Sequence, residues 1–279
     1  MFLEIIKFII YSALIVLISK YILVTTLRKL AESLKLKPKT VGNIAGYATS
    51  IPELLTITTS SLRGLSGASV YNIISSNVIN FIQYIGAILL NKNVDKIKNR
   101  AIITDIILVI FTILIPIVLL KMNIELNIMI VPIFVILYIL FRVINDNVHK
   151  MYLKNEDEKI EHKIEVEEEK ESKNRFQTIK YIIYLVITGF LLYFVGDKLG
   201  NTLETLCKLF NISEAIIGIL LGFITSIPEL MTFFESQKYY KKEDDDMLGV
   251  VEATNNLLTS NILNLFAIQT IGILITSIL

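Results

Sequence analysis

The chain has 279 residues, of which 53% are hydrophobic and 19% are charged, and its formal net charge is +1. The apolar residues gather in runs of about twenty, the length of a helix that crosses a hydrocarbon core of roughly 30 Å, which excludes a soluble protein. The charges lie between these runs and nearly cancel, so no nucleic-acid partner is indicated. Since backbone polar groups in lipid must bond to one another, the expected fold class is an all-α membrane protein.

The apolar runs predict about eight spans, five before a charged segment and three after it. In chain order they cover residues 4–26, 41–62, 70–91, 101–120, 126–144, 178–197, 213–234 and 247–277. No small-residue cleavage site follows the first run, so we expect a retained span and not a signal peptide. The protein is therefore predicted to be a multi-pass protein of the cell membrane, with the lipid bilayer as its surroundings.

The segment between the two groups of spans, residues 145–177, contains the run EDEKIEHKIEVEEEKES. It is too charged to bury, so we expect a solvated cytoplasmic linker. Its two histidines, His149 and His162, are expected to be solvated. The single cysteine, Cys207, has no partner for a disulfide or a metal site and is expected to be a packing residue.

Lysine and arginine are concentrated in alternate loops, which predicts one orientation in the membrane. The loop after the first span holds Arg28, Lys29, Lys35, Lys37 and Lys39, and the loop after the third holds Lys92, Lys96, Lys98 and Arg100. Basic loops remain in the cytoplasm. We therefore expect the N-terminus outside and the linker in the cytoplasm.

Two motifs occur twice, once in each half of the chain. The hexapeptide TSIPEL stands at 49–54 and at 225–230, and the pattern N-x-x-[ST]-S-N-x-x-N follows it at 72–80 and at 256–264. Because an odd number of spans precedes the linker, the second half enters the membrane in the opposite sense, which makes an inverted-topology repeat. The expected division is a first repeat at 1–144, the linker at 145–177 and a second repeat at 178–279.

The repeated hexapeptide places Glu53 and Glu229 inside spans. A carboxylate there costs several kcal/mol unless it meets a polar cavity or a counter-charge, and no lysine or arginine lies near the middle of a predicted span. A bound ion or a proton is then the expected partner. On a helix Thr49 and Ser50 share a face with Glu53, and the same holds for Thr225, Ser226 and Glu229.

The prolines of the hexapeptide add backbone oxygens to this set. Pro52 and Pro228 cannot donate to the carbonyl four residues earlier, so carbonyls near 48–49 and 224–225 are freed. In the second motif Ser76 and Asn80 share a face, as do Ser260 and Asn264. Two carboxylates, hydroxyls, amides and carbonyls suit a hard cation such as calcium or sodium, while the absence of Cys and His from these motifs disfavours soft metals. Purely structural roles are the alternative: helix kinks, polar contacts between helices and a protonated glutamate. Asn77 and Asn261 are expected to be helix-packing residues.

These motifs resemble those of the cation/calcium exchanger superfamily, whose two α-repeats carry a G-[ST]-[ST]-x-P-E motif followed by a G-S-N-x-x-[ND] motif. The resemblance implies a cation antiporter, neither an enzyme nor a cofactor protein, that exchanges calcium for sodium by alternating access. It also implies a set of ion ligands in this chain: Glu53, Glu229, Ser50, Ser226, Ser76, Ser260, Asn80, Asn264 and the carbonyls of Gly46, Thr49, Gly222 and Thr225.

The sequence departs from the superfamily pattern at several points. Asparagine stands at both 80 and 264, where many members have an aspartate in one repeat, and Ser75 and Thr259 replace glycine. TSIPE differs from the GNAxE-type motif of the proton-coupled branch. Members usually have ten spans, so this chain lacks the last two, and a homodimer or a second subunit is expected to complete the packing. The alternative functions are a proton-coupled calcium exchanger and a non-transporting scaffold or cation sensor.

Overall fold

The computed structural model is a bundle of long helices, and it describes residues 2–34, 36–122, 124, 126–152, 175–211, 213–242 and 245–278. The first half contains α1 (Phe2–Ile18), η1 (Ser19–Leu23), α2 (Val24–Ser33), α3 (Pro38–Thr49), α4 (Ile51–Leu62), α5 (Ser66–Leu90), η2 (Val94–Lys98), α6 (Arg100–Lys121), η3 (Ile128–Ile130) and α7 (Val131–Tyr152). The second half contains α9 (Arg175–Phe210), α10 (Glu214–Thr225), α11 (Ile227–Lys242), α12 (Asp246–Ile262), η4 (Leu263–Ile268) and α13 (Gln269–Ile278). No strand occurs in these residues, which confirms the all-α expectation.

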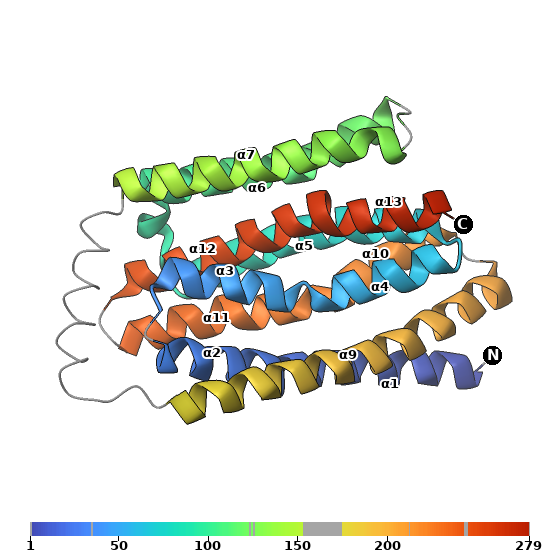
Figure 1. The fold of residues 1–279 in the computed structure, drawn as a ribbon, viewed down its shortest axis with the longest axis horizontal. Coiled ribbons are helices and arrows are strands. Elements are labelled where there is room, and N and C mark those ends of the chain that lie inside the picture. Colours follow the sequence, from blue (N-terminus) through green and yellow to red (C-terminus); the bar gives the residue numbers. More distant parts are fainter. Residues whose placement is uncertain are drawn as a thin grey trace.

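The helices run side by side along the long axis of the molecule, with α6 and α7 forming a pair at one edge and α1, α2 and α9 at the other (Figure 1). Within the described residues, seven helices are long and apolar enough to cross a membrane. The predicted span at 41–62 is present as α3 and α4, which run parallel to those seven in Figure 1 but are not among them. Buried hydroxyl groups in this segment, such as those of Thr56, Ser60 and Ser61, make it more polar than the seven candidate spans.

Two helices extend well beyond their predicted spans because one face of each continues to be buried. In α9 the residues Leu199, Leu203 and Leu206 follow each other at helical spacing and are at most 8% exposed. Helix α7 continues to Tyr152, and its last two turns bury Asn145 and His149. The prediction that His149 is solvated is therefore wrong, since its side chain is 3% exposed. His162 lies outside the described residues, as does the side chain of Cys207.

The two halves are interleaved so that each repeat packs against the other. Helix α3 of the first half packs on α12 of the second, and α10 of the second half packs on α5 of the first. Glycines permit this close approach: a Cβ on Gly46 would lie 2.7 Å from Cβ of Thr259, and one on Gly218 would lie 2.5 Å from the carbonyl oxygen of Ala68. The second motif of each half thus lies against the first motif of the other.

Candidate ion-binding site

Both TSIPEL hexapeptides interrupt a helix at the same position. Helix α3 ends at Thr49 and α4 begins at Ile51, while α10 ends at Thr225 and α11 begins at Ile227. The residues between them, Ser50 and Ser226, have ψ angles near zero, +2° and −2°. The proline in each hexapeptide stands at the start of the new helix, where its missing N–H costs nothing. The sequence predicted freed carbonyls here but not that the helix would end.

Each break points the negative end of a half-helix, at the C-terminus of α3 or of α10, toward the middle of the bundle, the arrangement by which interrupted membrane helices coordinate cations. Glu53 and Glu229 stand in the first turns of the following helices, and both are completely buried. Thr225 lies close to Glu53, and Thr49 lies close to Glu229, without completing a hydrogen bond. The threonine of one repeat therefore faces the carboxylate of the other.

A chain of hydrogen bonds joins side chains of both repeats around Glu229. The Ser260 hydroxyl donates to Oε1 of Glu229 at 2.9 Å and also contacts the Ser50 hydroxyl at 2.9 Å. The Asn80 amide donates to Ser260 at 3.4 Å. Ser50 in turn donates to the carbonyl of Gly46 at 2.8 Å. Four of the predicted site side chains thus form one connected group.

Further, looser contacts involve the remaining predicted site residues. The Ser76 hydroxyl is 3.4 Å from that of Thr225 and 3.5 Å from the carbonyl oxygen of Gly222. Asn264 donates to the side-chain oxygen of Asn77 at 3.3 Å. All twelve predicted site residues are buried in the bundle, since the ten with side chains are at most 1% exposed and both glycines are buried.

Several oxygens in this centre are buried without a hydrogen-bond partner, which is rare and calls for an explanation. They are both carboxylate oxygens of Glu53, Oε2 of Glu229, the Ser226 hydroxyl and the side-chain oxygens of Asn80 and Asn264. Carboxylate, hydroxyl and amide oxygens are the ligand type that a hard cation takes. The residues present therefore fit a calcium or sodium ion.

Two further asparagines belong to this region although they were not predicted as site residues. Asn72 accepts from Ser76 at 3.1 Å, and Asn256 accepts from Thr49 at 3.4 Å while donating to Thr232. Their positions are equivalent in the two repeats, because each is the first residue of the second motif. That repeated first position was the signal that could have identified them. Asn77 and Asn261 pair reciprocally across α5 and α12, each amide donating to the other's backbone carbonyl, as expected for helix-packing residues.

Buried acids also occur outside the site. Oδ2 of Asp105 lies 2.6 Å from Nε2 of His149 and Oδ1 accepts from Asn145 at 2.8 Å, while Glu252 forms a salt bridge with Arg28. The signal for Asp105 was a lone acid in an apolar run. Within the described residues, no three His, Cys, Asp or Glu side chains gather around a common point. The candidate site therefore contains two carboxylates.

The comparisons with known proteins that found a match all found sodium/calcium exchangers. Residues 5–145 and 180–279 match the family model described as sodium/calcium exchanger protein. No curated protein matches the chain. Among solved structures, the chain is similar to the sodium-calcium exchanger NCX_Mj soaked with 100 mM Na+ and 10 mM Sr2+, with a TM-score of 0.58 and 19% identity over 99% of this chain and 83% of that one. For the same exchanger soaked with 2.5 mM Na+ and 0.1 mM Ca2+ the TM-score is 0.56 and the identity 21%, over 98% and 82%. These similarities show a shared fold.

Proposed function

Because the chain belongs to the sodium/calcium exchanger protein family, we propose that it is an antiporter that exchanges calcium for sodium across the membrane by alternating access. The family is one of transporters and not of enzymes, and its description names sodium and calcium as the exchanged ions. Membership also confirms the resemblance that the duplicated motifs indicated.

The observation that carries this proposal is the Glu53 carboxylate. It is completely buried, and neither of its oxygens has a hydrogen-bond partner among the described residues. Leaving a buried charge without a partner costs several kcal/mol. A transported cation would remove that cost when it binds, and the cost would return when the cation leaves. The buried carboxylate therefore makes a site occupied by an ion more stable than an empty one.

Charge balance supports exchange between calcium and sodium. The two glutamates together carry two negative charges, which one calcium ion or two sodium ions would neutralise. Either occupant leaves the buried centre without net charge, the state that is cheapest in a medium of low dielectric constant. The side chains of Ser50, Ser76, Ser226, Ser260, Asn80 and Asn264 and the carbonyls of Gly46, Thr49, Gly222 and Thr225 would complete the ligand set.

Calcium uptake into vesicles that contain the purified protein and a sodium gradient tests this function. We expect Glu53→Gln and Glu229→Gln each to abolish sodium-dependent calcium uptake, because either change leaves a single carboxylate for a divalent ion. Asp95→Asn makes the same chemical change at a side chain that is 85% exposed in η2, and it should transport like the unaltered protein.

The same vesicles separate the alternatives. Uptake driven by a proton gradient without sodium would indicate a proton-coupled calcium exchanger. Calcium binding with no uptake under either gradient would indicate a cation sensor or scaffold. Undiminished sodium-dependent uptake in both glutamine variants would disprove the proposed site.

A further inference from the structure

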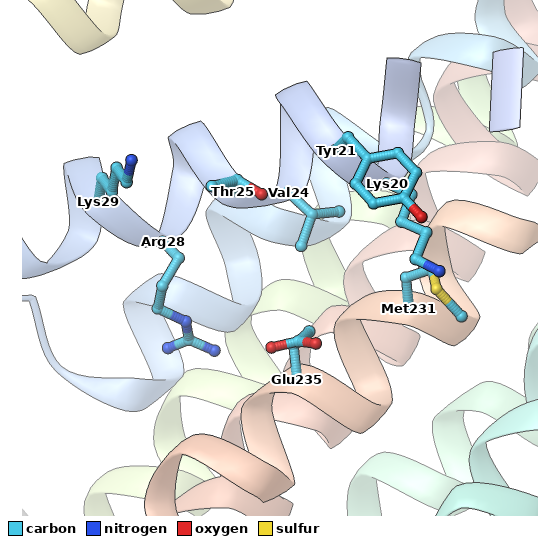
Figure 2. Close-up of a pocket in the computed structure, with 8 residues that line it drawn as sticks. All are labelled: Lys20, Tyr21, Val24, Thr25, Arg28, Lys29, Met231 and Glu235. Atoms are coloured by element: carbon cyan, nitrogen blue, oxygen red, sulfur yellow. The ribbon is translucent and has the colours of Figure 1, made fainter. Parts of the chain in front are cut away.

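Two adjoining cavities lie between the first and the second half of the chain. The outer one, of about 320 Å³, separates η1 and α2 from α11, and Figure 2 shows Lys20 and Lys29 at its opposite ends with Glu235 between them. The inner one is smaller and shares part of its wall with the outer one. Its lining residues are Val24, Leu27, Arg28, Val41, Ala45, Thr232, Glu235 and Glu252. Together the two cavities form one recess between α2 and α11.

The outer cavity reaches the level of the lipid head groups, where water and ions have access to it. At about 1.5 Å per residue, Lys7 and Arg28 are separated by roughly 31 Å along the helix, close to the thickness of the hydrocarbon core. Lys29, at one end of the cavity, therefore stands at its aqueous side, and both Lys29 and Glu235 are exposed.

The inner cavity ends beside the ion site. Thr232, on its wall, donates to the backbone carbonyl of Glu229 at 2.8 Å and accepts from the amide of Asn256. The side-chain oxygen of Asn256 accepts from Thr49 at 3.4 Å. The recess therefore leads from the head-group level to the side chains that surround Glu229.

The repeat-related helices at the other end of the bundle are in contact instead. Gly196 of α9 stands at the same distance before its hexapeptide as Lys20 of η1. A Cβ on Gly196 would lie 3.3 Å from Cβ of Leu55, and one on Gly200 would lie 3.0 Å from Oγ1 of Thr59, both in α4. Helix α9 thus packs directly on α4, whereas a cavity separates α2 from α11. The recess is on the side of the bundle end at which α9 begins (Figure 1), the end that the basic loops predict to be cytoplasmic.

Arg28 occupies the junction of the two cavities. It lines both of them, and its guanidinium donates to Oε2 of Glu252 at 2.8 Å and lies 4.7 Å from the centre of the Tyr239 ring. Glu252 belongs to α12 and is 3% exposed, so this salt bridge joins α2 to α12 across the recess. A cation that moves between the outer cavity and Thr232 has to pass the guanidinium, which repels it.

We propose that Arg28 is the gate of a cation passage that runs through this recess from the ion site to the cytoplasmic end of the bundle. The proposal rests on the antiport function proposed above. While Arg28 binds Glu252, the passage is closed to cations. When the long side chain turns toward the head groups, Glu252 and Glu235 present two carboxylates to the passing ion, which match the charge of one calcium ion. The guanidinium and the transported cation thus compete for Glu252.

Labelling of an introduced cysteine tests the gate without a measurement of transport. In a Cys207→Ser background, Thr232→Cys places a thiol on the wall of the inner cavity. The protein in lipid nanodiscs is then exposed at both faces to a membrane-impermeant, positively charged methanethiosulfonate. Adding Arg28→Gln should speed the labelling of this thiol about tenfold or more, because a repelling charge leaves the passage.

The matched control is Thr56→Cys, which stands in the first half at the position equivalent to Thr232 and is also buried. It should be labelled slowly whether or not Arg28 is replaced, since α9 packs directly on α4. Equal labelling rates of Thr232→Cys with and without Arg28→Gln would overturn the proposal. An equal increase at Thr56→Cys would overturn it as well, because the change would then loosen the whole bundle.

A second variant protects the test against misfolding, since Arg28→Gln alone leaves Glu252 buried without its partner. Arg28→Gln with Glu252→Gln removes both charges and should also speed the labelling of Thr232→Cys; an unchanged rate would contradict the gate. Titration of the unaltered protein with calcium keeps the two proposals apart. Absence of calcium binding would contradict the antiporter, whereas the labelling rates report on the gate and require no calcium.

Discussion

Individual buried residues outside the ion site hold the first-half helices to α12. Asp105 of α6 is bound by His149 and Asn145 of α7, and Asn145 also donates to Asn255 of α12 at 3.3 Å. The sequence did not reveal this group, because His149 stands in a polar stretch that was assigned to the linker. A single sequence does not show that the helical spacing of Asn145 and His149 turns both side chains toward an acid on another helix. The site glutamates could be recognised because the hexapeptide around each of them occurs twice in the sequence.

Replacing His149 by alanine should destabilise the protein by about 3–5 kcal/mol, because the completely buried Asp105 loses one of its partners. The expected result is a clear fall in melting temperature in detergent. Lys150→Ala changes the next residue, which is exposed, and should leave the melting temperature nearly unchanged. Adding Asp105→Asn to His149→Ala should recover part of the loss, since the unpaired charge is removed. A stable His149→Ala protein would mean that Asp105 is satisfied in another way.

At the level of helices, the sequence predicted where the spans lie better than how they are built. The run 41–62 was predicted as one span in which a proline frees backbone carbonyls, and the structure breaks it into α3 and α4 at Ser50. The contact of α3 with α12 joins residues about two hundred positions apart, which hydropathy cannot reveal. Only the identity of the two hexapeptides indicated that the halves share one site. The extra length of α9 is due to buried leucines on one face of an otherwise polar segment.

Gly46→Ala should lower both thermal stability and calcium uptake. The new Cβ would meet the backbone oxygen of Asn256 at 2.8 Å as well as the Thr259 side chain, so α3 and α12 would have to separate. That movement would displace Ser260 from Ser50. Gly86→Ala is the matched control in α5, where no atom lies within 4 Å of the new Cβ, and it should be neutral or slightly stabilising because alanine favours helix by about 1 kcal/mol. Equal behaviour of the two variants would contradict close packing at Gly46.

In the whole molecule, the loops that join the helices lie at the two opposite ends of the bundle. The N- and C-termini lie at one end of the bundle in Figure 1, and α7 ends and α9 begins at the opposite end. The basic segment around η2 lies at that opposite end as well. One end of the molecule is therefore rich in lysine and arginine, which is the arrangement that the predicted orientation requires, with the N-terminus outside.

Single cysteines introduced into a Cys207→Ser background test that orientation. Lys96→Cys, in η2, should react with a membrane-impermeant thiol reagent only when the reagent reaches the cytoplasmic side. Ser213→Cys, between α9 and α10, should react from the outside. Both side chains are exposed, so a lack of reaction reports the membrane and not burial. Labelling of the two positions from the same side would contradict the inverted arrangement of the halves. Labelling of Lys96→Cys from the outside and of Ser213→Cys from the cytoplasm would show that the predicted orientation is reversed.

The unequal hydrogen bonding of the two hexapeptides has a consequence for motion. Ser50 contacts Ser260, which donates to Glu229, whereas the repeat-related counterparts of Ser50 and Glu229, which are Ser226 and Glu53, have no such bonds. In an inverted repeat, exchanging the conformations of the halves turns the molecule over with respect to the membrane. Under the proposed alternating access, we therefore expect a second state with the mirror pattern, in which Ser226 contacts Ser76 and Ser76 donates to Glu53. On this proposal, the hydrogen bonding of these two serines distinguishes the two states of the exchanger.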